Sequence, residues 1–190
     1  MYRGKDKRGL LFNIIITHLP GYSNFIATKA QLRDILGEDF VIVDSRQSII
    51  FGKVSEPYRA VEMLVNSLPS TTPILKIIPV DDVTDARLES ITESVKKLST
   101  KIPVSASFAI RLHGYPYKIV EGEYIRLHRD EAIREIAEHV NRRVDLTNPE
   151  WVIYIRITKL YGATELASIT VAPPDKIISV QKLSRIKPSH

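Results

Sequence analysis

The segment from His113 to His128 combines the side-chain types that hold single-stranded RNA. Its Gly-Tyr-Pro-Tyr-Lys run at 114–118 places two aromatic rings and a cation beside a glycine, which allows the backbone many conformations. Bases stack on such rings, while cations neutralise phosphates. More cations precede the next expected helix, whose N-terminal N–H groups can also bind a phosphate. The candidate RNA contacts here are His113, Tyr115, Tyr117, Lys118, Arg126 and Arg129. A β-hairpin whose tyrosines pack on the domain is the alternative interpretation.

Two further arginines lie on expected strands. In residues 107–112 and 151–157, apolar side chains alternate with others, the pattern of a strand with one strongly apolar face. Arg111 and Arg156 both lie opposite the more apolar face. If the two strands are neighbours, the two guanidinium groups share one surface, and each can pair with a phosphate through two N–H groups. Alternatively, each arginine covers the sheet or pairs with a carboxylate.

The residue types that catalysis commonly needs are missing or scattered. The chain has no cysteine, so it has no thiolate nucleophile, disulfide framework or cysteine zinc site. Neither Gly-x-Gly-x-x-Gly nor Gly-x-x-x-x-Gly-Lys-Ser/Thr occurs. The histidines lack the spacing of a metal site, and the acidic cluster Asp81, Asp82 and Asp85 is better explained by the positive end of a helix. We therefore expect no metal, no cofactor and no catalytic activity.

Charge is concentrated at the two ends of the chain. Residues 1–9 and 175–190 each carry four cations against one carboxylate, so each end is +3, whereas residues 10–174 are −1 in a chain of +5. Basic ends suit a polyanion through counterion release, and solvated tails are an equal alternative. The N-terminus lacks the apolar stretch of a signal peptide, and the apolar runs are too short to span a membrane. We expect a cytoplasmic protein without a membrane contact.

Residues 10–80 read as two strand–helix–strand passages. An isoleucine-rich run at 11–17 predicts a buried strand, and Thr-Lys-Ala-Gln at 28–31 has the spacing of a capping box for a helix that ends near Gly37. The remaining expected elements are a hairpin at 40–54, a helix at 56–67 and a strand at 73–80. The order βαββαβ predicts a ferredoxin-like domain over residues 10–80.

Residues 81–175 alternate helices with strands. The expected elements are a helix from Asp82 or Thr84 to Leu98, a strand at 107–112, a helix from Arg129 to Arg143, a strand at 151–157 and a last strand at 165–171. The run Val-Asp-Leu-Thr-Asn-Pro at 144–149 precedes the strand at 151–157, and its Asn-Pro predicts a turn that sets the direction of this strand. The chain is therefore expected to be α+β, with an α/β domain over 81–175 and basic tails at 1–9 and 176–190.

This order, and above all the Val-Asp-Leu-Thr-Asn-Pro turn feeding a strand, resembles the THUMP domain. THUMP proteins usually carry a ferredoxin-like domain immediately before it, so the resemblance covers nearly the whole chain. The chain looks closest to the stand-alone THUMP proteins, which are tRNA-binding adaptors without a catalytic centre. The resemblance implies that it holds the acceptor stem and the 3′ CCA end of tRNA. It also implies an RNA acetyltransferase that makes N4-acetylcytidine as the partner.

The chain departs from the family pattern at one place, and two other functions stay open. Relatives carry a denser basic run directly after the first strand of the domain, where this chain has only Arg111 and His113. One alternative is the RNA-binding subunit of a split tRNA methyltransferase or thiolation enzyme. The other is a protein-interaction module without RNA binding. The salt dependence of binding distinguishes a protein-interaction module from an RNA-binding protein, because phosphate contacts weaken steeply with ionic strength.

Overall fold

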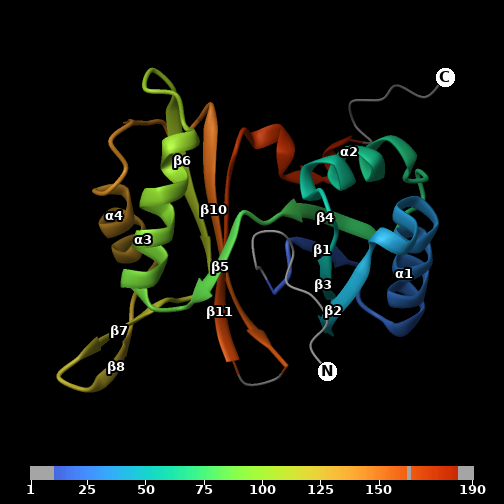
Figure 1. Cartoon of the computed structure of the whole chain (residues 1–190), viewed down its shortest axis with the longest axis horizontal. Helices are drawn as coiled ribbons and strands as arrows, with labels where there is room; N and C mark the ends of the chain where they lie inside the picture. Colours follow the sequence, from blue (N-terminus) through green and yellow to red (C-terminus); the bar gives the residue numbers. More distant parts are fainter. Residues whose placement is uncertain (1–10, 162–163, 184–190) are drawn as a thin grey trace. The chain divides into compact units, whose positions relative to one another are not determined.

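The computed structural model describes residues 11–161 and 164–183. They form two compact units, one containing the chain up to Val80 and from Asp175 onward, the other containing Asp81–Pro174. In each unit, helices cover a sheet (Figure 1). Residues 1–9 of the expected N-terminal basic tail and 184–190 of the C-terminal tail lie outside the described residues.

The first unit has the ferredoxin-like arrangement that its element order predicts. Its elements are β1 (Ile14–His18), α1 (Tyr22–Leu36), η1 (Gly37–Asp39), β2 (Val41–Arg46), β3 (Ile49–Lys53), α2 (Pro57–Ser67), β4 (Ile74–Pro79), β12 (Ile178–Ser179) and α5 (Val180–Leu183). The strands pair antiparallel in the order β12-β4-β1-β3-β2. Leu32 of α1 and Leu64 of α2 share a buried cluster with Ile14 and Ile77 of the sheet. Burial of this apolar cluster holds the two helices to the sheet.

Helix α1 begins earlier than the capping-box pattern predicts. Its first bond runs from the N–H of Phe25 to the carbonyl oxygen of Gly21, at 3.1 Å. Gly21 has φ +108, a value that favours glycine. Thr28, the expected cap, is instead buried within the helix. The capping prediction is therefore wrong, because a local pattern of side chains cannot show that an earlier turn is already helical.

The expected basic tail over 176–190 is not a tail in its first part. Ile178 and Ser179 form β12 and pair with β4 at the edge of the first sheet. Ile178 is buried in the core of that unit, and Lys176 Nζ lies 3.0 Å from Glu62 Oε1. A short 3-10 turn, η3 (Pro174–Lys176), precedes this strand. β4 lies far from this segment in the sequence, so the pairing could not be predicted from local patterns. The positive charge of the segment indicated a solvated tail instead.

The second unit places two helices on one face of a mixed sheet (Figure 1). Its elements are β5 (Asp82–Asp85), α3 (Leu88–Leu98), η2 (Ser99–Lys101), β6 (Ser107–His113), β7 (Tyr117–Val120), β8 (Glu123–Arg126), α4 (Arg129–Ala137), β9 (Arg143–Val144), β10 (Trp151–Leu160) and β11 (Thr164–Ala172). The sheet order is β5-β11-β10-β6-β9, with β6 parallel to both β10 and β9. Ile91 of α3 and Ile136 of α4 pack in one buried cluster with Ile110 and Ile153 of the sheet.

The acidic cluster at the start of this unit belongs to a strand rather than to a helix. Residues 82–85 form β5, which pairs with β11, and α3 starts only at Leu88. The buried carboxylate of Asp81 accepts the N–H of Val171 at 2.7 Å and lies 3.0 Å from Lys101 Nζ. The helix expected over 129–143 also ends earlier, at Ala137. Across residues 11–161 and 164–183, no three His, Asp or Glu side chains gather in a group that could hold a metal ion.

The turn at 144–149 fixes the parallel pairing of β6 with β10. Asp145 donates its N–H to the carbonyl oxygen of Phe108 at 2.9 Å, and its Oδ1 accepts the N–H groups of Thr147 and Asn148, each at 3.0 Å. The bonds from Asn148 and Thr147 lower the pKa of Asp145. Glu150 then bonds back to Ser107 at the start of β6. These bonds align the start of β10 with the start of β6, so the carboxyl ends of the two strands lie at the same edge of the sheet.

None of the helices in the described part of the chain combines the length and the apolar character that a membrane span requires.

Candidate nucleic-acid interface

Arg111, His113 and Arg156 share one face of the second sheet. In the parallel pair β6–β10, Arg111 lies beside Tyr154 and His113 lies beside Arg156. Strands lie about 4.8 Å apart and same-face residues about 6.6 Å apart, so the Cα atoms of the two arginines are about 8 Å apart. The two strands that carry the arginines are therefore neighbours, which is the condition under which the two guanidinium groups share one surface. Helices α3 and α4 cover the opposite face, whose side chains form the core.

Arg111 is available to a ligand. Its side chain is exposed, and it makes no hydrogen bond or ion pair with any residue in the described part of the chain. His113 and Arg156 beside it are half-buried. Without a carboxylate partner, the positive charge of an exposed guanidinium is uncompensated and its N–H groups are available to an anion. The alternative that Arg111 is paired with a carboxylate is therefore wrong for the described residues.

Tyr154 lies on the same face, across from Arg111 and two residues before Arg156. Its side chain is buried, and its hydroxyl has no hydrogen-bond partner within residues 11–161 and 164–183. Burial raises the pKa of Tyr154 above 10.0, while the guanidinium groups of Arg156 and Arg111 act against that rise. The ring of His113 packs against it, with centroids 4.9 Å apart. Tyr154 therefore stays neutral near pH 7 and keeps a hydroxyl that can donate a hydrogen bond.

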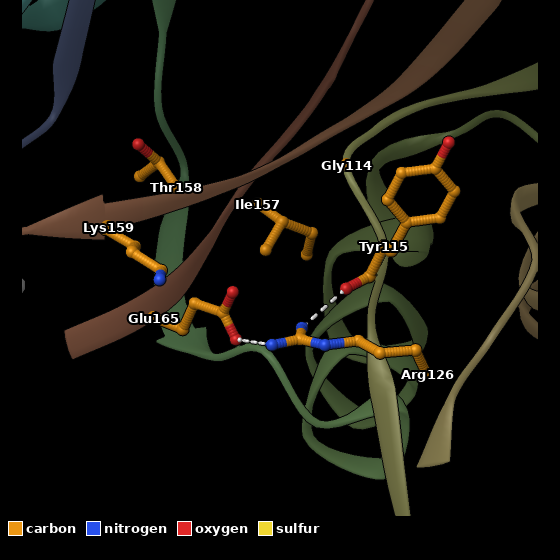
Figure 2. A pocket seen from close by; sticks show the side chains of 7 residues that line it. All are labelled: Gly114, Tyr115, Arg126, Ile157, Thr158, Lys159 and Glu165. Carbon is orange, nitrogen blue, oxygen red and sulfur yellow. Dashed lines mark hydrogen bonds and ion pairs between the residues drawn. The ribbon is translucent and has the colours of Figure 1, made fainter. Parts of the chain in front are cut away.

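A pocket of about 450 Å³ opens at the edge where the carboxyl ends of β6 and β10 meet (Figure 2). It is lined by Gly114, Tyr115, Arg126, Ile157, Thr158, Lys159 and Glu165. Tyr115 is 55% exposed, so its ring is accessible to an unpaired base. Lys159 is exposed and has no ion pair with any described residue. The pocket thus joins an aromatic ring and a cation to the edge of the arginine-bearing sheet.

Gly114 fixes the place of this aromatic ring. Its φ of +93 lies in the region that favours glycine, and a Cβ at this position would lie 2.7 Å from Ile157 Cβ. The chain therefore turns at Gly114 while it passes directly over β10. Only a residue without a side chain allows Tyr115 to leave the sheet at this point.

The guanidinium group of Arg126 is already bonded to other groups of the protein. Its guanidinium group donates to Glu165 Oε2 at 2.6 Å and to the carbonyl oxygen of Tyr115 at 3.0 Å (Figure 2). It also lies over the ring of Tyr117, 5.7 Å from the centroid. These contacts join β8 to β11 and to the segment before β7. Arg126 thus shapes one wall of the pocket, and its charge is neutralised by Glu165.

Tyr117 and Lys118 lie on a two-stranded hairpin, β7–β8, which is the alternative that the sequence left open for this segment. The ring of Tyr117 is half-buried and packs against Tyr124, with centroids 5.0 Å apart. Lys118 Nζ bonds to Glu135 Oε2 of α4 at 2.5 Å. That hydrogen bond raises the pKa of Lys118. Both side chains therefore hold the hairpin in place.

The eight candidate residues consequently fall into separate groups. Arg111, His113 and Arg156 share the sheet face, and Tyr115 lies at its edge. Tyr117, Lys118 and Arg126 stabilise the hairpin, and Arg129 is exposed at the first turn of α4. The structure does not bring these eight side chains together on one surface.

Sequence reasoning assigned no role to Tyr154 on the arginine-bearing face or to Lys159 beside the pocket. Tyr154 lies two residues before Arg156 and so on the same side of the strand, which the alternation over residues 151–157 already predicts. Lys159 lies past the expected strand end at residue 157 and on the opposite face of the strand from Arg156, because β10 extends to Leu160. The alternation of Tyr154, Arg156 and Thr158 was the available signal for a polar face. The length of β10 could not be predicted from the sequence, because it is set by the pairing with β11.

Known proteins share this fold. The family model of the THUMP domain matches residues 85–161. PH1313 from Pyrococcus horikoshii superposes with a TM-score of 0.60 at 19% identity, over 85% of this chain and 55% of that chain. A 4-thiouridine synthetase solved with RNA and ATP gives a TM-score of 0.50 at 15% identity, over 85% of this chain and 42% of that one. The present chain thus spans about half of their length. No curated protein sequence is significantly similar to it.

The match covers the strands and the turn described above. Residues 85–161 include the helices α3 and α4, the parallel pair β6–β10 and the Val-Asp-Leu-Thr-Asn-Pro turn between them. The arginine-bearing face and most of the pocket lining lie within the same range. Residues 85–161 of this chain thus match the family model of the THUMP domain, over less than half of the chain.

Proposed function

We propose that this protein is a non-catalytic tRNA-binding protein that holds the acceptor stem and the 3′ CCA end of tRNA and presents the tRNA to a modification enzyme. THUMP proteins bind tRNA and work with modification enzymes, so a role in tRNA modification follows from the domain. The observation that carries the proposal is the exposed guanidinium of Arg111, which has no carboxylate partner among the described residues, with Arg156 two residues further along the neighbouring strand on the same face.

The geometry suits a nucleic acid that is double-stranded at one part and single-stranded at the next. Arg111 and Arg156 offer N–H groups and charge to phosphates of a stem. Four residues further along the chain, Tyr115 offers an exposed ring beside the pocket. Base stacking on such a ring contributes about 1–3 kcal/mol per base. The acceptor end of tRNA, a stem followed by unpaired CCA, presents both features next to each other.

The same side chains do not form a catalytic arrangement. The charged side chains that line the pocket are Arg126, Lys159 and Glu165, and Glu165 is already bonded to Arg126. In the described residues of this site, no nucleophile lies paired with a general base. A surface of cations and one aromatic ring binds and orients RNA. We therefore assign the chemistry of modification to another protein.

Binding to tRNA with its CCA end intact, compared with the same tRNA trimmed of that end, tests the RNA part of the proposal. Fluorescence anisotropy with the purified protein at two salt concentrations is the measurement. We expect about tenfold tighter binding to the intact tRNA, and weaker binding to both at high salt, because phosphate contacts release counterions. Equal affinity for the two tRNAs would contradict the assignment of the acceptor end. An affinity that does not change with salt concentration would contradict binding through phosphates.

The enzyme partner we propose is an RNA cytidine acetyltransferase that makes N4-acetylcytidine, on the strength of the likeness to stand-alone THUMP adaptors. Deleting the gene and measuring modified nucleosides in bulk tRNA by mass spectrometry tests this part. Loss of N4-acetylcytidine alone is the expected result. Loss of a methylated or thiolated nucleoside would assign the chain to a split methyltransferase or thiolation enzyme instead. An unchanged nucleoside profile would refute a role in tRNA modification.

A further inference from the structure

The β7–β8 hairpin exposes apolar side chains that a domain normally covers. Ile119, Val120, Tyr124 and Ile125 are exposed to 39%, 47%, 72% and 44%. In Figure 1 the hairpin extends beyond the sheet and the helices of its own unit. The strands join through Glu121 and Gly122, whose φ values of +50 and +86 are those of a tight type I′ turn. Exposed apolar patches of this kind mark sites of interaction.

Both faces of the hairpin carry apolar residues. The register pairs Ile119 with Tyr124, and Val120 with Glu123 one step further. Because side chains alternate along a strand, Ile119 and Tyr124 lie on one face, whereas Val120 and Ile125 lie on the other. A hairpin that only packed on its own domain would bury one face and expose polar residues on the other. Here neither face is buried at the tip, so the exposed surface suits insertion into a partner.

The base of the hairpin is firmly held. The N–H of Tyr117 donates to the carbonyl oxygen of Ala86 at 3.1 Å, and the N–H of Leu127 to that of Pro116 at 3.0 Å. Two ion pairs add to these bonds, Lys118 with Glu135 and Arg126 with Glu165. Side chains from α4 and β11 of the same unit therefore fix the hairpin. A rigid base means that little conformational entropy is lost when the tip binds a partner.

The charge around the tip disfavours a phosphate backbone as the occupant. Glu121 and Glu123 are exposed at the turn, and neither carboxylate has an ion pair with a described residue. The hydrogen bond to Glu135 raises the pKa of Lys118, and the nearby charges of Glu89 and Glu131 act in the same direction. Both cations of the hairpin, Lys118 and Arg126, are already neutralised. The tip of the hairpin is thus acidic and apolar, in a chain whose net charge is +5.

We propose that the β7–β8 hairpin is a docking arm for another protein, whose surface there is an apolar groove flanked by lysines or arginines. Exposed Tyr124 and Ile125 fill the groove, while Glu121 and Glu123 meet the cations at its rim. Charge complementarity fixes the orientation and suppresses other partners. The inference rests on the proposed function in one respect, which is that the modification enzyme is the protein expected to carry the groove.

Photo-crosslinking of the full chain in its native cells tests the proposal. A benzoylphenylalanine at position 124 reacts with whatever contacts the tip, and mass spectrometry identifies the attached molecule and peptide. We expect an adduct with a protein segment that contains apolar residues next to lysine or arginine. Adducts only with RNA, only with lipid or only with a second copy of this chain would overturn the proposal, as would the absence of an adduct.

Charge reversal separates specific docking from capture by chance. We expect the pair Glu121→Lys and Glu123→Lys to lower the adduct yield by at least about tenfold. Lys→Glu or Arg→Glu changes in the crosslinked partner peptide should restore it. The pair Asp34→Lys and Glu38→Lys makes the same charge change at exposed sites of the first unit and should leave the yield unchanged. An adduct that survives reversal at the tip, or is not restored by the partner changes, would count against the docking arm.

The variant Tyr124→Ser with Ile125→Ser distinguishes this inference from the tRNA-binding role. Both side chains are exposed, so the melting temperature should change little, and the affinity for tRNA should stay within about twofold. A large loss of tRNA affinity would make the hairpin an RNA contact and overturn the proposal. If the unaltered protein fails to bind tRNA while the charge-swapped adducts form, the RNA role fails and the docking arm stands.

Discussion

Arg111 and Arg126 come from one short stretch of sequence and end in opposite electrostatic situations. Arg111 points from the sheet into solvent without a carboxylate partner among the described residues, and Arg156 lies beside it. Arg126 is bonded to Glu165, and its neighbour on the hairpin, Lys118, to Glu135. The difference teaches that cation-rich composition does not locate a phosphate site. The position of carboxylates on remote elements decides which cations stay available.

The largest effect is expected at Gly114, which connects the sheet face with the hairpin. Gly114→Ala combines a positive φ with a Cβ 2.7 Å from Ile157 Cβ. We expect it to lower the free energy of unfolding by about 3 kcal/mol, about 1 from the backbone conformation and about 2 from the overlap. Urea denaturation of the purified protein measures it.

Gly122→Ala is the matched control for this prediction. Gly122 also has a positive φ, +86, but nothing lies within 4 Å of an added Cβ. We expect a loss of only about 1 kcal/mol there. Equal losses at both glycines would mean that the close passage of Gly114 over β10 does not constrain the fold.

Removing the two arginines of the sheet should have the next largest effect, and on binding rather than stability. We expect Arg111→Ala with Arg156→Ala to weaken tRNA binding by about 100-fold, which is about 2.7 kcal/mol. The slope of log K against log salt should fall by about 1.4 to 1.8. Anisotropy titrations over a salt series measure both.

The pair Lys118→Ala and Arg126→Ala sharpens the comparison, because these cations are already neutralised. We expect their loss to change tRNA affinity by less than about threefold. Lys96→Ala, an exposed cation on α3, serves as the control for unspecific charge effects. A stronger effect from the hairpin pair than from the sheet pair would place the RNA on the hairpin and reverse the argument.

Tyr154→Phe tests the electrostatics of the sheet face through pH. Burial raises the native pKa of Tyr154 above 10.0, its ordinary value. As pH rises above 10.0, the unfolded chain releases this proton while the folded chain retains it, so the native protein loses stability. The phenylalanine variant lacks that loss. We expect it to be more stable at neutral pH by about 1 kcal/mol or less, since the hydroxyl has no partner within the described chain.

Thermal unfolding of both proteins between pH 8 and 11 checks this prediction. The difference in stability should be constant below pH 10 and should widen above it in favour of Tyr154→Phe. A difference that stays constant throughout would show that Tyr154 titrates alike in the folded and unfolded chain.

The smallest effect concerns the ion pair of Arg126 and Glu165. A double-mutant cycle with Arg126→Ala and Glu165→Ala should give a coupling of about 0.5 kcal/mol, because the arginine side chain is 54% exposed and water screens the pair. Urea denaturation of the four proteins measures it. A coupling near 3 kcal/mol would instead indicate a pair shielded from water, and the pocket would then be more closed than its lining suggests.

Part of the candidate site was readable from the chain. The alternation in residues 107–112 and 151–157 assigned Arg111 and Arg156 to polar faces, and the two strands are indeed neighbours. The pairing of Lys118 with Glu135 and of Arg126 with Glu165 was not readable. The second of these pairs spans 39 residues, and no local pattern records which side chains meet across such a distance.

Helix starts and the chain end illustrate the same limit. Asp82–Asp85 was predicted as the start of a helix, yet it forms β5 because an unpaired edge of β11 is available to it. Residues 178–179 were predicted as part of a tail, yet they complete the edge of the first sheet at β4. In both cases a strand from elsewhere in the chain satisfies the backbone N–H and carbonyl groups, and that outweighs local preference.

By itself, the sequence determined the ferredoxin-like order from β1 to β4, the strands β6 and β10 with their polar faces, and the resemblance of the second unit to the THUMP domain. These features depend on side-chain periodicity and on turns such as Asn148-Pro149, which act over a few residues. Only the tertiary structure decided which cations remain free, where Tyr115 leaves the sheet, and that the β7–β8 hairpin exposes an acidic, apolar tip. Those outcomes depend on ion pairs and packing between remote residues, which form only when the chain has folded.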